Sequence, residues 1–177
     1  MDSYYGWLQL VLFIGLLAAL TKPLGRYLAS VLDADGTTFL DPVAAPCERL
    51  IYRLLGIKSS QEQSWRQYGL SLFAFSLVRL LFTYAVLRLQ HLLPLNPQGF
   101  GPVSPDLAFN TAVSFTTNTN WQSYGGESTL SYFSQMVGLT LQNFASAAAG
   151  IAVAAALVRG LSRHSTATIG NFWVDIV

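Results

Sequence analysis

Three long apolar runs separated by polar segments dominate the pattern of this chain. They cover residues 4–20, 68–89 and 130–158, and the third contains no charged residue. A helix that rises about 1.5 Å per residue needs about 20 apolar residues to cross the hydrocarbon core of a bilayer. No Lys or Arg precedes the first run, although a signal peptide would carry one there. The pattern therefore predicts three transmembrane helices, the first of them retained at the N-terminus.

A shorter helical segment lies between the second and third runs. Pro94 and Pro97 break the second helix, and a Ser-Pro-Asp sequence at 104–106 favours the start of another. That helix is only about a dozen residues long, too short to span a membrane. It gives way to an uncharged polar stretch at 116–126, so the segment reads as a re-entrant loop, which membranes tolerate where protein buries it or where it lines a watery path. An ordinary Thr/Asn-rich external loop is the alternative.

The segment between the first and second runs, residues 22–67, holds a short amphipathic pattern. Asp41-Pro42 favours a helix start, charged and apolar positions follow at helical spacing over residues 46–55, and Gly56 is a fitting end. This helix could lie on a membrane or pack on protein. Residues 33–37 match the DxDGT nucleophile motif of haloacid-dehalogenase phosphotransferases. A loop between two spans cannot supply the sheet and the further residues which that chemistry requires, so we interpret the match as a polar turn.

Basic residues are distributed unevenly among the connecting segments. None lies before the first run or in residues 91–129, whereas two follow the third run and six lie in residues 22–67: Lys22, Arg26, Arg49, Arg53, Lys58 and Arg66. The positive-inside rule places the segment with most basic residues in the cytoplasm. It predicts that residues 22–67 and the C-terminal end are cytoplasmic, and that the N-terminus and residues 91–129 are outside.

The composition agrees with an all-α membrane protein. The chain is 52% hydrophobic and 11% charged, and its net charge of +1 lacks the clustered basic excess of a nucleic-acid-binding protein. A single cysteine, Cys47, excludes a disulfide framework, and His91 and His164 share no metal-ligand spacing. No P-loop, HExxH, GxSxG or dinucleotide-binding glycine motif occurs. We therefore expect no catalysis and no ATP binding by this chain alone.

The re-entrant pattern itself points to a potassium ion. A short helix entering the membrane turns the partially negative end of its dipole toward the membrane centre, which favours a cation there. The extended return would offer backbone carbonyls, which can replace the hydration shell of potassium. Helix, pore helix, polar strand and helix is the plan of a potassium-channel subunit.

Two stretches, FNTAVSF at 109–115 and TNTNWQSY at 117–124, resemble the first pore loop of the potassium-binding, channel-like subunits of bacterial Kdp-type potassium-transporting ATPases. The similarity extends to LPLNP at 93–97, QMVGLT at 135–140, QNF at 142–144 and GNFWVD at 170–175. It covers essentially the whole chain, and the pore-loop run is long enough to be specific.

The resemblance implies a fold of four helix–pore-helix–filter–helix repeats of the potassium-channel-like superfamily, preceded by one extra N-terminal helix. On that template we expect the N-terminal transmembrane helix at 4–21 and a cytoplasmic loop with the amphipathic helix at 22–67. The first repeat then occupies residues 68–159, and residues 160–177 begin the cytoplasmic connection to a second repeat. The chain would be the N-terminal portion of a longer subunit.

The resemblance also implies the ion site. The potassium-binding filter strand maps onto Asn118, Thr119 and Asn120, which we expect to bind the ion through backbone carbonyls. Gln122 falls where the family places a residue that influences ion affinity. The residues expected to support the filter are Thr116, Thr117, Trp121 and Gln122.

Arg79 departs from the family, which usually has a small or apolar residue midway along this span. An arginine at mid-membrane is costly and normally faces protein or water. We expect it to pair with another repeat or subunit, with a partner carboxylate or a phospholipid as the alternatives.

Polar residues on the third run form one stripe, made of Gln135, Gln142 and Ser146. Such residues hydrogen-bond across helices, and this is the interpretation we favour. The alternative is that the stripe lines the ion path.

The function that the resemblance implies is the potassium-binding and translocating part of an ATP-driven, high-affinity uptake complex in the bacterial inner membrane. Its partners would be a P-type ATPase subunit that hydrolyses ATP and smaller accessory subunits, with the lipid bilayer around them. Two other functions stay open. One is a homotetrameric potassium channel, and the other is a non-conducting membrane assembly subunit whose polar loop docks a partner.

Overall fold

A computed structural model describes residues 2–32, 36–163 and 166–177. These residues form helices, turns and loops, with an isolated β-bridge between Ser64 and Thr168. Three helical stretches are long and apolar enough to cross a membrane: Tyr4–Val31, Trp65–Leu92 and Ser134–Ser162. The prediction of an all-α membrane protein is therefore confirmed. The aspartates of the DxDGT match, and also His164, lie outside the described residues.

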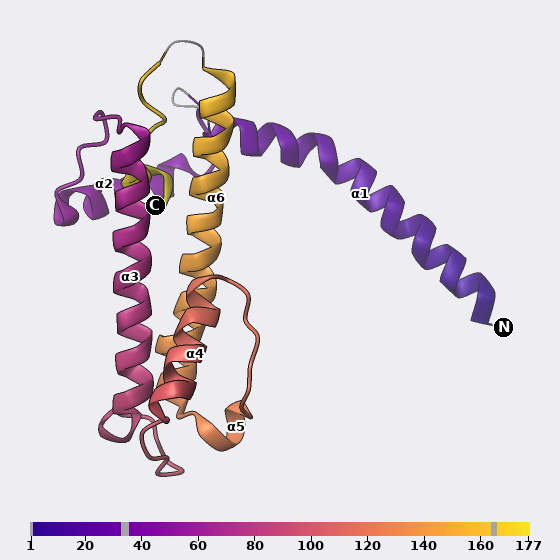
Figure 1. Cartoon of the computed structure of the whole chain (residues 1–177). Coiled ribbons are helices and arrows are strands. Elements are labelled where there is room, and N and C mark those ends of the chain that lie inside the picture. The colour runs from indigo at the N-terminus through magenta and orange to yellow at the C-terminus, as the bar shows by residue number, and fades with distance from the viewer. Residues whose placement is uncertain (1, 33–35, 164–165) are drawn as a thin grey trace. The chain divides into compact units, whose positions relative to one another are not determined.

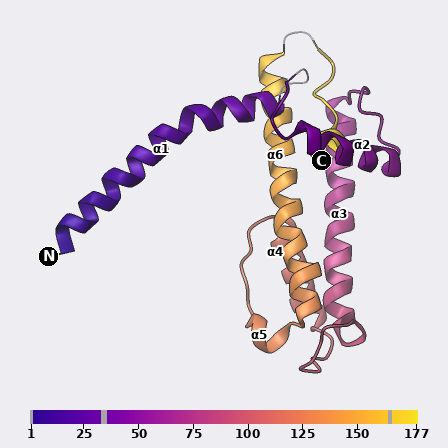
Figure 2. The same ribbon diagram turned by 180° about the vertical axis from the view of Figure 1, so that it is seen from behind.

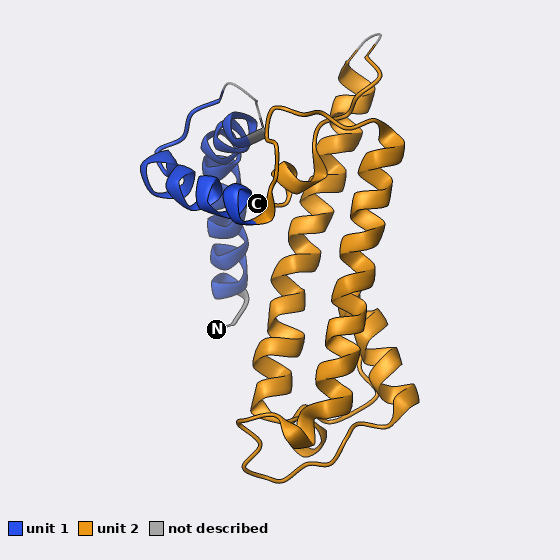
Figure 3. Cartoon of the chain, turned by 90° about the vertical axis from the view of Figure 1, so that its left-hand side faces the viewer, with its two compact units in different colours: residues 1–54 blue, residues 55–177 orange. Residues whose placement is uncertain are grey.

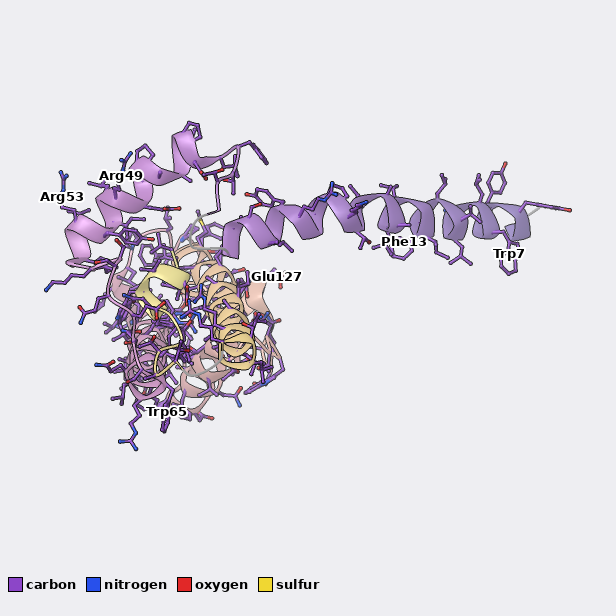
Figure 4. The ribbon with its side chains drawn as sticks, turned by 90° about the horizontal axis from the view of Figure 1, so that it is seen from above. Trp7, Phe13, Arg49, Arg53, Trp65 and Glu127 are labelled. Carbon is purple, nitrogen blue, oxygen red and sulfur yellow. The ribbon has the colours of Figure 1, made fainter. Side chains whose placement is uncertain are left out.

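The chain divides into two compact units, residues 1–54 and residues 55–177, which we describe separately (Figure 3). The first unit holds α1 (Asp2–Leu32) and most of α2 (Asp41–Leu55). Helix α1 continues beyond the predicted end at residue 21 and through Pro23. A proline removes one backbone donor, but the Leu, Arg and Ala residues that follow it are good helix formers. Large apolar side chains such as Trp7 and Phe13 project from α1 and are exposed, as in a helix that faces lipid (Figure 4).

Helix α2 confirms the short helix predicted after Asp41. The Asp41 carboxylate accepts hydrogen bonds from the backbone and side chain of Thr38 at the start of the helix. These bonds hold the pKa of Asp41 below its usual range. Arg49 and Arg53 lie on the same side of the helix, as expected for residues four apart (Figure 4). Gly56 follows with a left-handed φ of 66°, a conformation that glycine adopts without strain.

The second unit is a helical hairpin with a short helix packed against it. In chain order it contains α3 (Trp65–Leu89), η1 (Gln90–Leu92), α4 (Pro105–Thr116), α5 (Gly126–Thr129), the π-helix η2 (Ser134–Thr140), α6 (Leu141–Ser162) and α7 (Phe172–Asp175). Helices α3 and α6 run side by side, and α4 contacts both (Figures 1 and 2). Helix α4 starts near the end of α3, stops part-way along the hairpin, and the chain returns as an extended segment to α5 (Figure 1). The predicted order of helix, short helix, extended return and helix is thus confirmed.

Sequence signals explain both the start of α3 and the arrangement beside it. Ser64 and Gln67 form a capping box, in which each side chain bonds to the other residue's backbone N–H. Nearby, Arg163 after α6 forms an ion pair of 2.9 Å with Glu62, and the Thr168 hydroxyl donates to the same carboxylate. The hydroxyl and the guanidinium, in that order, hold the pKa of Glu62 below its usual range. These bonds place the beginning of α3 and the end of α6 at one end of the hairpin.

A mixed apolar and ionic cluster fills the hairpin behind this end. The Tyr68 hydroxyl donates to the Ala152 carbonyl at 2.7 Å and to Asp175 at 2.9 Å, and Arg159 pairs with Asp175 at 2.6 Å. The ring of Phe172 is fully buried edge-on to Tyr68. Helix α7 is therefore packed into the hairpin.

The opposite end is organised by Gln90, whose side chain is 1% exposed. Its amide donates to the carbonyls of Gly101 and Thr129, and its oxygen accepts from the backbone N–H of Ser131 and the hydroxyl of Ser134. A small apolar core lies beside it, formed by Leu87, Val103, Ala108, Phe115, Leu130 and Leu139. Gln90 thus joins the loop before α4 to the segment after α5 and fixes where α4 begins.

Candidate functional site: the segment after the pore helix

The end of α4 turns directly into the predicted filter segment, residues 118–120. The backbone N–H of Asn118 donates to the carbonyl of Phe115 at 3.3 Å. The N–H groups of Thr119 and Asn120 both donate to the carbonyl of Ser114, at 3.1 and 3.4 Å. The last four carbonyls of a helix have no partner within it. The filter segment therefore folds back on the helix end and satisfies part of it.

The backbone of this segment has an unusual conformation. Asn118 and Asn120 are left-handed, with φ of 58° and 56°, while Thr119 between them has a negative φ. Asparagine tolerates this conformation better than most residues, although at some cost. When φ alternates in sign along a chain, successive peptide groups turn the same way. Since the N–H groups here face α4, the carbonyls are directed away from it.

The three carbonyl oxygens of residues 118–120 accept no hydrogen bond from any residue that the structure describes. All three residues are exposed in this chain. Three consecutive unpaired carbonyls are the type of ligand that replaces water around a potassium ion. Strained backbone that persists on a braced segment is also typical of ligand-binding sites.

Two threonine hydroxyls brace the segment from the side of α4. Thr117, the C-cap of α4, donates from Oγ1 to the carbonyl of Val113 at 2.9 Å. Thr119 donates from Oγ1 to the carbonyl of Ser114 at 3.1 Å. These bonds turn both hydroxyls toward the helix rather than toward a site formed by the carbonyls.

Two buried serines hold the segment at its ends. Ser114 donates from Oγ to the carbonyl of Trp121 at 2.8 Å, so this one residue of α4 bonds to Thr119, Asn120 and Trp121. Ser146 on α6 donates to Oδ1 of Asn118 at 3.2 Å and to the carbonyl of Gln142 at 2.6 Å. The Gln142 amide in turn donates to Oγ1 of Thr83 on α3 at 2.7 Å. The filter segment is therefore connected to both long helices.

Arg79 lies midway along α3 and reaches the end of α4. Its side chain is buried, with 7% exposed, and Nη2 donates to the carbonyl of Thr116 at 2.8 Å. The guanidinium also stacks over the ring of Phe75, 4.7 Å from its centroid. We expected Arg79 to pair with another repeat or subunit. In this structure its partner is the C-terminal end of α4 in the same chain.

The structure places most of the predicted residues in one arrangement. Asn118, Thr119 and Asn120 form the segment, Thr116 is the last residue of α4, and Thr117 and Trp121 lie on either side, held by Val113 and Ser114. Gln122 is exposed in the return segment. The residues that the sequence did not single out are Ser114, Phe115 and Val113, whose backbone or hydroxyl groups do the bracing. A buried serine in an apolar helix was the available signal for Ser114.

The polar stripe on the third run forms hydrogen bonds to neighbouring segments, the interpretation that the sequence favours. Gln142 and Ser146 are buried and hydrogen-bond across helices, to α3 and to the filter segment. Gln135 is part-buried and donates to the carbonyls of Gly126 and Leu130. The stripe therefore supports the loop through hydrogen bonds.

Comparison with known proteins places this arrangement in a family. The KdpA family model, described as potassium-transporting ATPase A subunit, matches residues 11–177. A potassium-transporting ATPase potassium-binding subunit from Granulibacter bethesdensis is 58% identical over 175 residues, which are 99% of this chain and 31% of the relative. The corresponding subunit from Rhodospirillum centenum is 61% identical over 97% of this chain and 30% of its own length.

This chain thus spans about a third of the length of the curated relatives it matches. The match is nonetheless continuous across both units, from within α1 to the C-terminal residue. The chain belongs to the KdpA family of potassium-transporting ATPase A subunits.

Proposed function

We propose that this chain forms part of the potassium-binding and translocating subunit of an ATP-driven potassium uptake complex in the bacterial inner membrane. The observation that supports this most directly is the segment at residues 118–120. Its N–H groups are used by α4, and its three carbonyls are free within the described part of the chain. Potassium binds to carbonyl oxygens that replace its water ligands. The names of the relatives describe potassium-binding subunits, which agrees with this chemistry.

We propose a division of labour within the complex, which the family membership of this chain supports. This chain contributes no hydrolysis of ATP, and a P-type ATPase subunit supplies that reaction, with smaller accessory subunits completing the assembly. The chain provides one wall of the filter through Asn118, Thr119 and Asn120, and other repeats of the subunit provide the remaining walls. Potassium enters from the external side, since the loop at residues 91–129 is expected there.

Substitutions at Asn120 separate backbone ligands from side-chain ligands. Glycine adopts a φ near 56° readily, whereas the β-branched valine strongly disfavours it. If the ligands are carbonyls, Asn120→Gly should keep the apparent KM for potassium near that of the parent, and Asn120→Val should raise it on the order of tenfold, the effect of a 1–2 kcal/mol cost for a left-handed residue. The measurement is potassium-stimulated ATP hydrolysis by the complete complex.

The control is Ser123→Val, which adds a β-branched residue at an exposed position of the same return segment. It should leave the potassium dependence unchanged. Equal loss of affinity in Asn120→Gly and Asn120→Val would show that the carboxamide is the ligand. Unchanged affinity in Asn120→Val would show that the filter is elsewhere.

A further inference from the structure

Arg79 places a full positive charge at the end of α4 where a pore helix normally offers a negative one. Three of the last four carbonyls of α4 accept bonds from the residues that follow the helix: the Val113 carbonyl from Thr117, and the Ser114 and Phe115 carbonyls from the filter segment. The fourth, on Thr116, accepts from the Arg79 guanidinium at 2.8 Å. The C-terminal end of a helix carries about half a negative charge, which stabilises cations near it. In this chain that end is already occupied by a cation of the protein.

The charge of Arg79 is poorly compensated by its surroundings. Among the residues described, no Asp or Glu lies within salt-bridge distance of it. Its Nε and Nη1 are buried without a hydrogen-bond partner there, as are Oγ1 of Thr116 and Oε1 of Gln142. Buried charges without a counter-ion act over longer distances than exposed ones, since little solvent screens them.

The position of Arg79 brings this charge close to the filter segment. Thr116, its hydrogen-bond partner, precedes Asn118 by two residues along the chain. The side-chain amide of Gln142 donates to the backbone carbonyl of Arg79, and the backbone carbonyl of Gln142 accepts from the Ser146 hydroxyl. The same hydroxyl donates to Oδ1 of Asn118. The guanidinium and the filter segment are therefore parts of one hydrogen-bonded unit.

We infer that Arg79 determines cation affinity in this subunit: its guanidinium caps α4 and, as a fixed positive charge, weakens binding of potassium on the adjacent carbonyls. This inference rests on the proposed function of residues 118–120. It predicts that removal of the Arg79 charge raises potassium affinity, whereas a purely structural role predicts that affinity falls. Loss of a brace loosens the filter and weakens potassium binding, whereas loss of a repelling charge strengthens it.

The test uses the complete complex with three variants at this position. Arg79→Lys keeps the charge, Arg79→Gln keeps a hydrogen-bond donor without the charge, and Arg79→Met removes both. The apparent KM for potassium should stay near the parent value in the lysine variant. It should fall about tenfold in the other two, because both remove a unit positive charge that little solvent screens from the adjacent carbonyls.

Rubidium provides the second measurement, because a point charge does not distinguish ions of equal charge. The KM for rubidium should fall by the same factor, which leaves the ratio of the two constants unchanged. An unchanged or raised KM for potassium in Arg79→Gln and Arg79→Met would overturn the inference. Asn120→Val, assayed in parallel, separates the two proposals: if it raises KM while the Arg79 variants have no effect, only the role of Arg79 is wrong, and if it has no effect, the filter assignment fails.

Discussion

Ser114 shows how much of this site depends on one small residue. Its carbonyl accepts the N–H groups of Thr119 and Asn120, and its hydroxyl donates to the carbonyl of Trp121. The side chain is fully buried, so its hydroxyl is shielded from solvent. A serine is the smallest residue that can make both contacts at this depth.

Ser114→Ala should therefore loosen the end of the filter segment without disturbing α4. A lost hydrogen bond to the part-buried Trp121 carbonyl costs about 1 kcal/mol, so we expect the KM for potassium to rise about fivefold and discrimination against rubidium to fall. The measurement is ATP hydrolysis by the complete complex, stimulated by potassium for the KM and by rubidium for the discrimination. Ser123→Ala, at an exposed position nearby, is the matched control. If Ser114→Ala has normal affinity and selectivity, the hydroxyl is not a brace of the filter.

At the level of elements, the packing of η2 against α3 fixes the second long helix of the hairpin. The run at 130–158 was predicted as one helix, but it begins in an extended conformation and continues as the π-helix η2 before α6. Thr140 supports the wider turns by donating from Oγ1 to the carbonyl of Gln135 at 2.9 Å. Gly138 is buried there, and a Cβ atom at this position would meet Cγ1 of Val86 at 3.3 Å.

Relative to Gly150→Ala, Gly138→Ala should destabilise the complete subunit by about 1 kcal/mol, the lower range for overpacking a close contact, because both substitutions gain helix propensity and only the first meets Val86. The double variant with Val86→Ala should recover part of that loss, because it removes the atom that the new methyl group meets. Gly150→Ala is the control, since a Cβ there meets nothing within 4 Å and alanine favours helix. The measurement is the thermal unfolding midpoint in detergent. Equal effects of Gly138→Ala and Gly150→Ala would exclude the contact as the cause.

The difference between prediction and structure at this level has a physical origin. Helix boundaries with local signals, such as the capping box at Ser64 and the prolines at 94 and 97 that follow the second run, can be predicted from sequence. So was the polar filter segment, because uncharged polar residues between apolar runs are conspicuous. The π-helix and the pairing of Arg79 with Thr116 depend on contacts between residues distant in the chain, which no local pattern encodes. Helix α1 continues through Pro23 because the helix propensity of the residues that follow offsets the loss of one backbone hydrogen bond.

For the molecule as a whole, the second unit supports the orientation predicted from the basic residues. The ion pair of Glu62 with Arg163 brings the residues before α3 and after α6 to the same end of the hairpin. Lys58, Arg66 and Arg159 also lie in or beside these segments, whereas residues 91–129 at the other end contain no Lys or Arg. Because basic segments are retained in the cytoplasm, the end with the ion pair should be cytoplasmic and the end with the filter loop external.

Cysteine labelling in intact cells measures this orientation directly. The exposed native Cys47 is first replaced by serine, as is any other cysteine of the complete subunit. Single cysteines are then introduced at Ser60, Ser123 and Ser162, all of which are exposed in the structure. Ser123→Cys should react with a membrane-impermeant maleimide in intact cells, since an external filter loop has to meet the potassium solution. The other two should react only after the membrane is permeabilised, which also shows that those sites are reactive. Labelling of Ser123→Cys only after permeabilisation would reverse the orientation, and with it the proposal that this loop takes up potassium from outside.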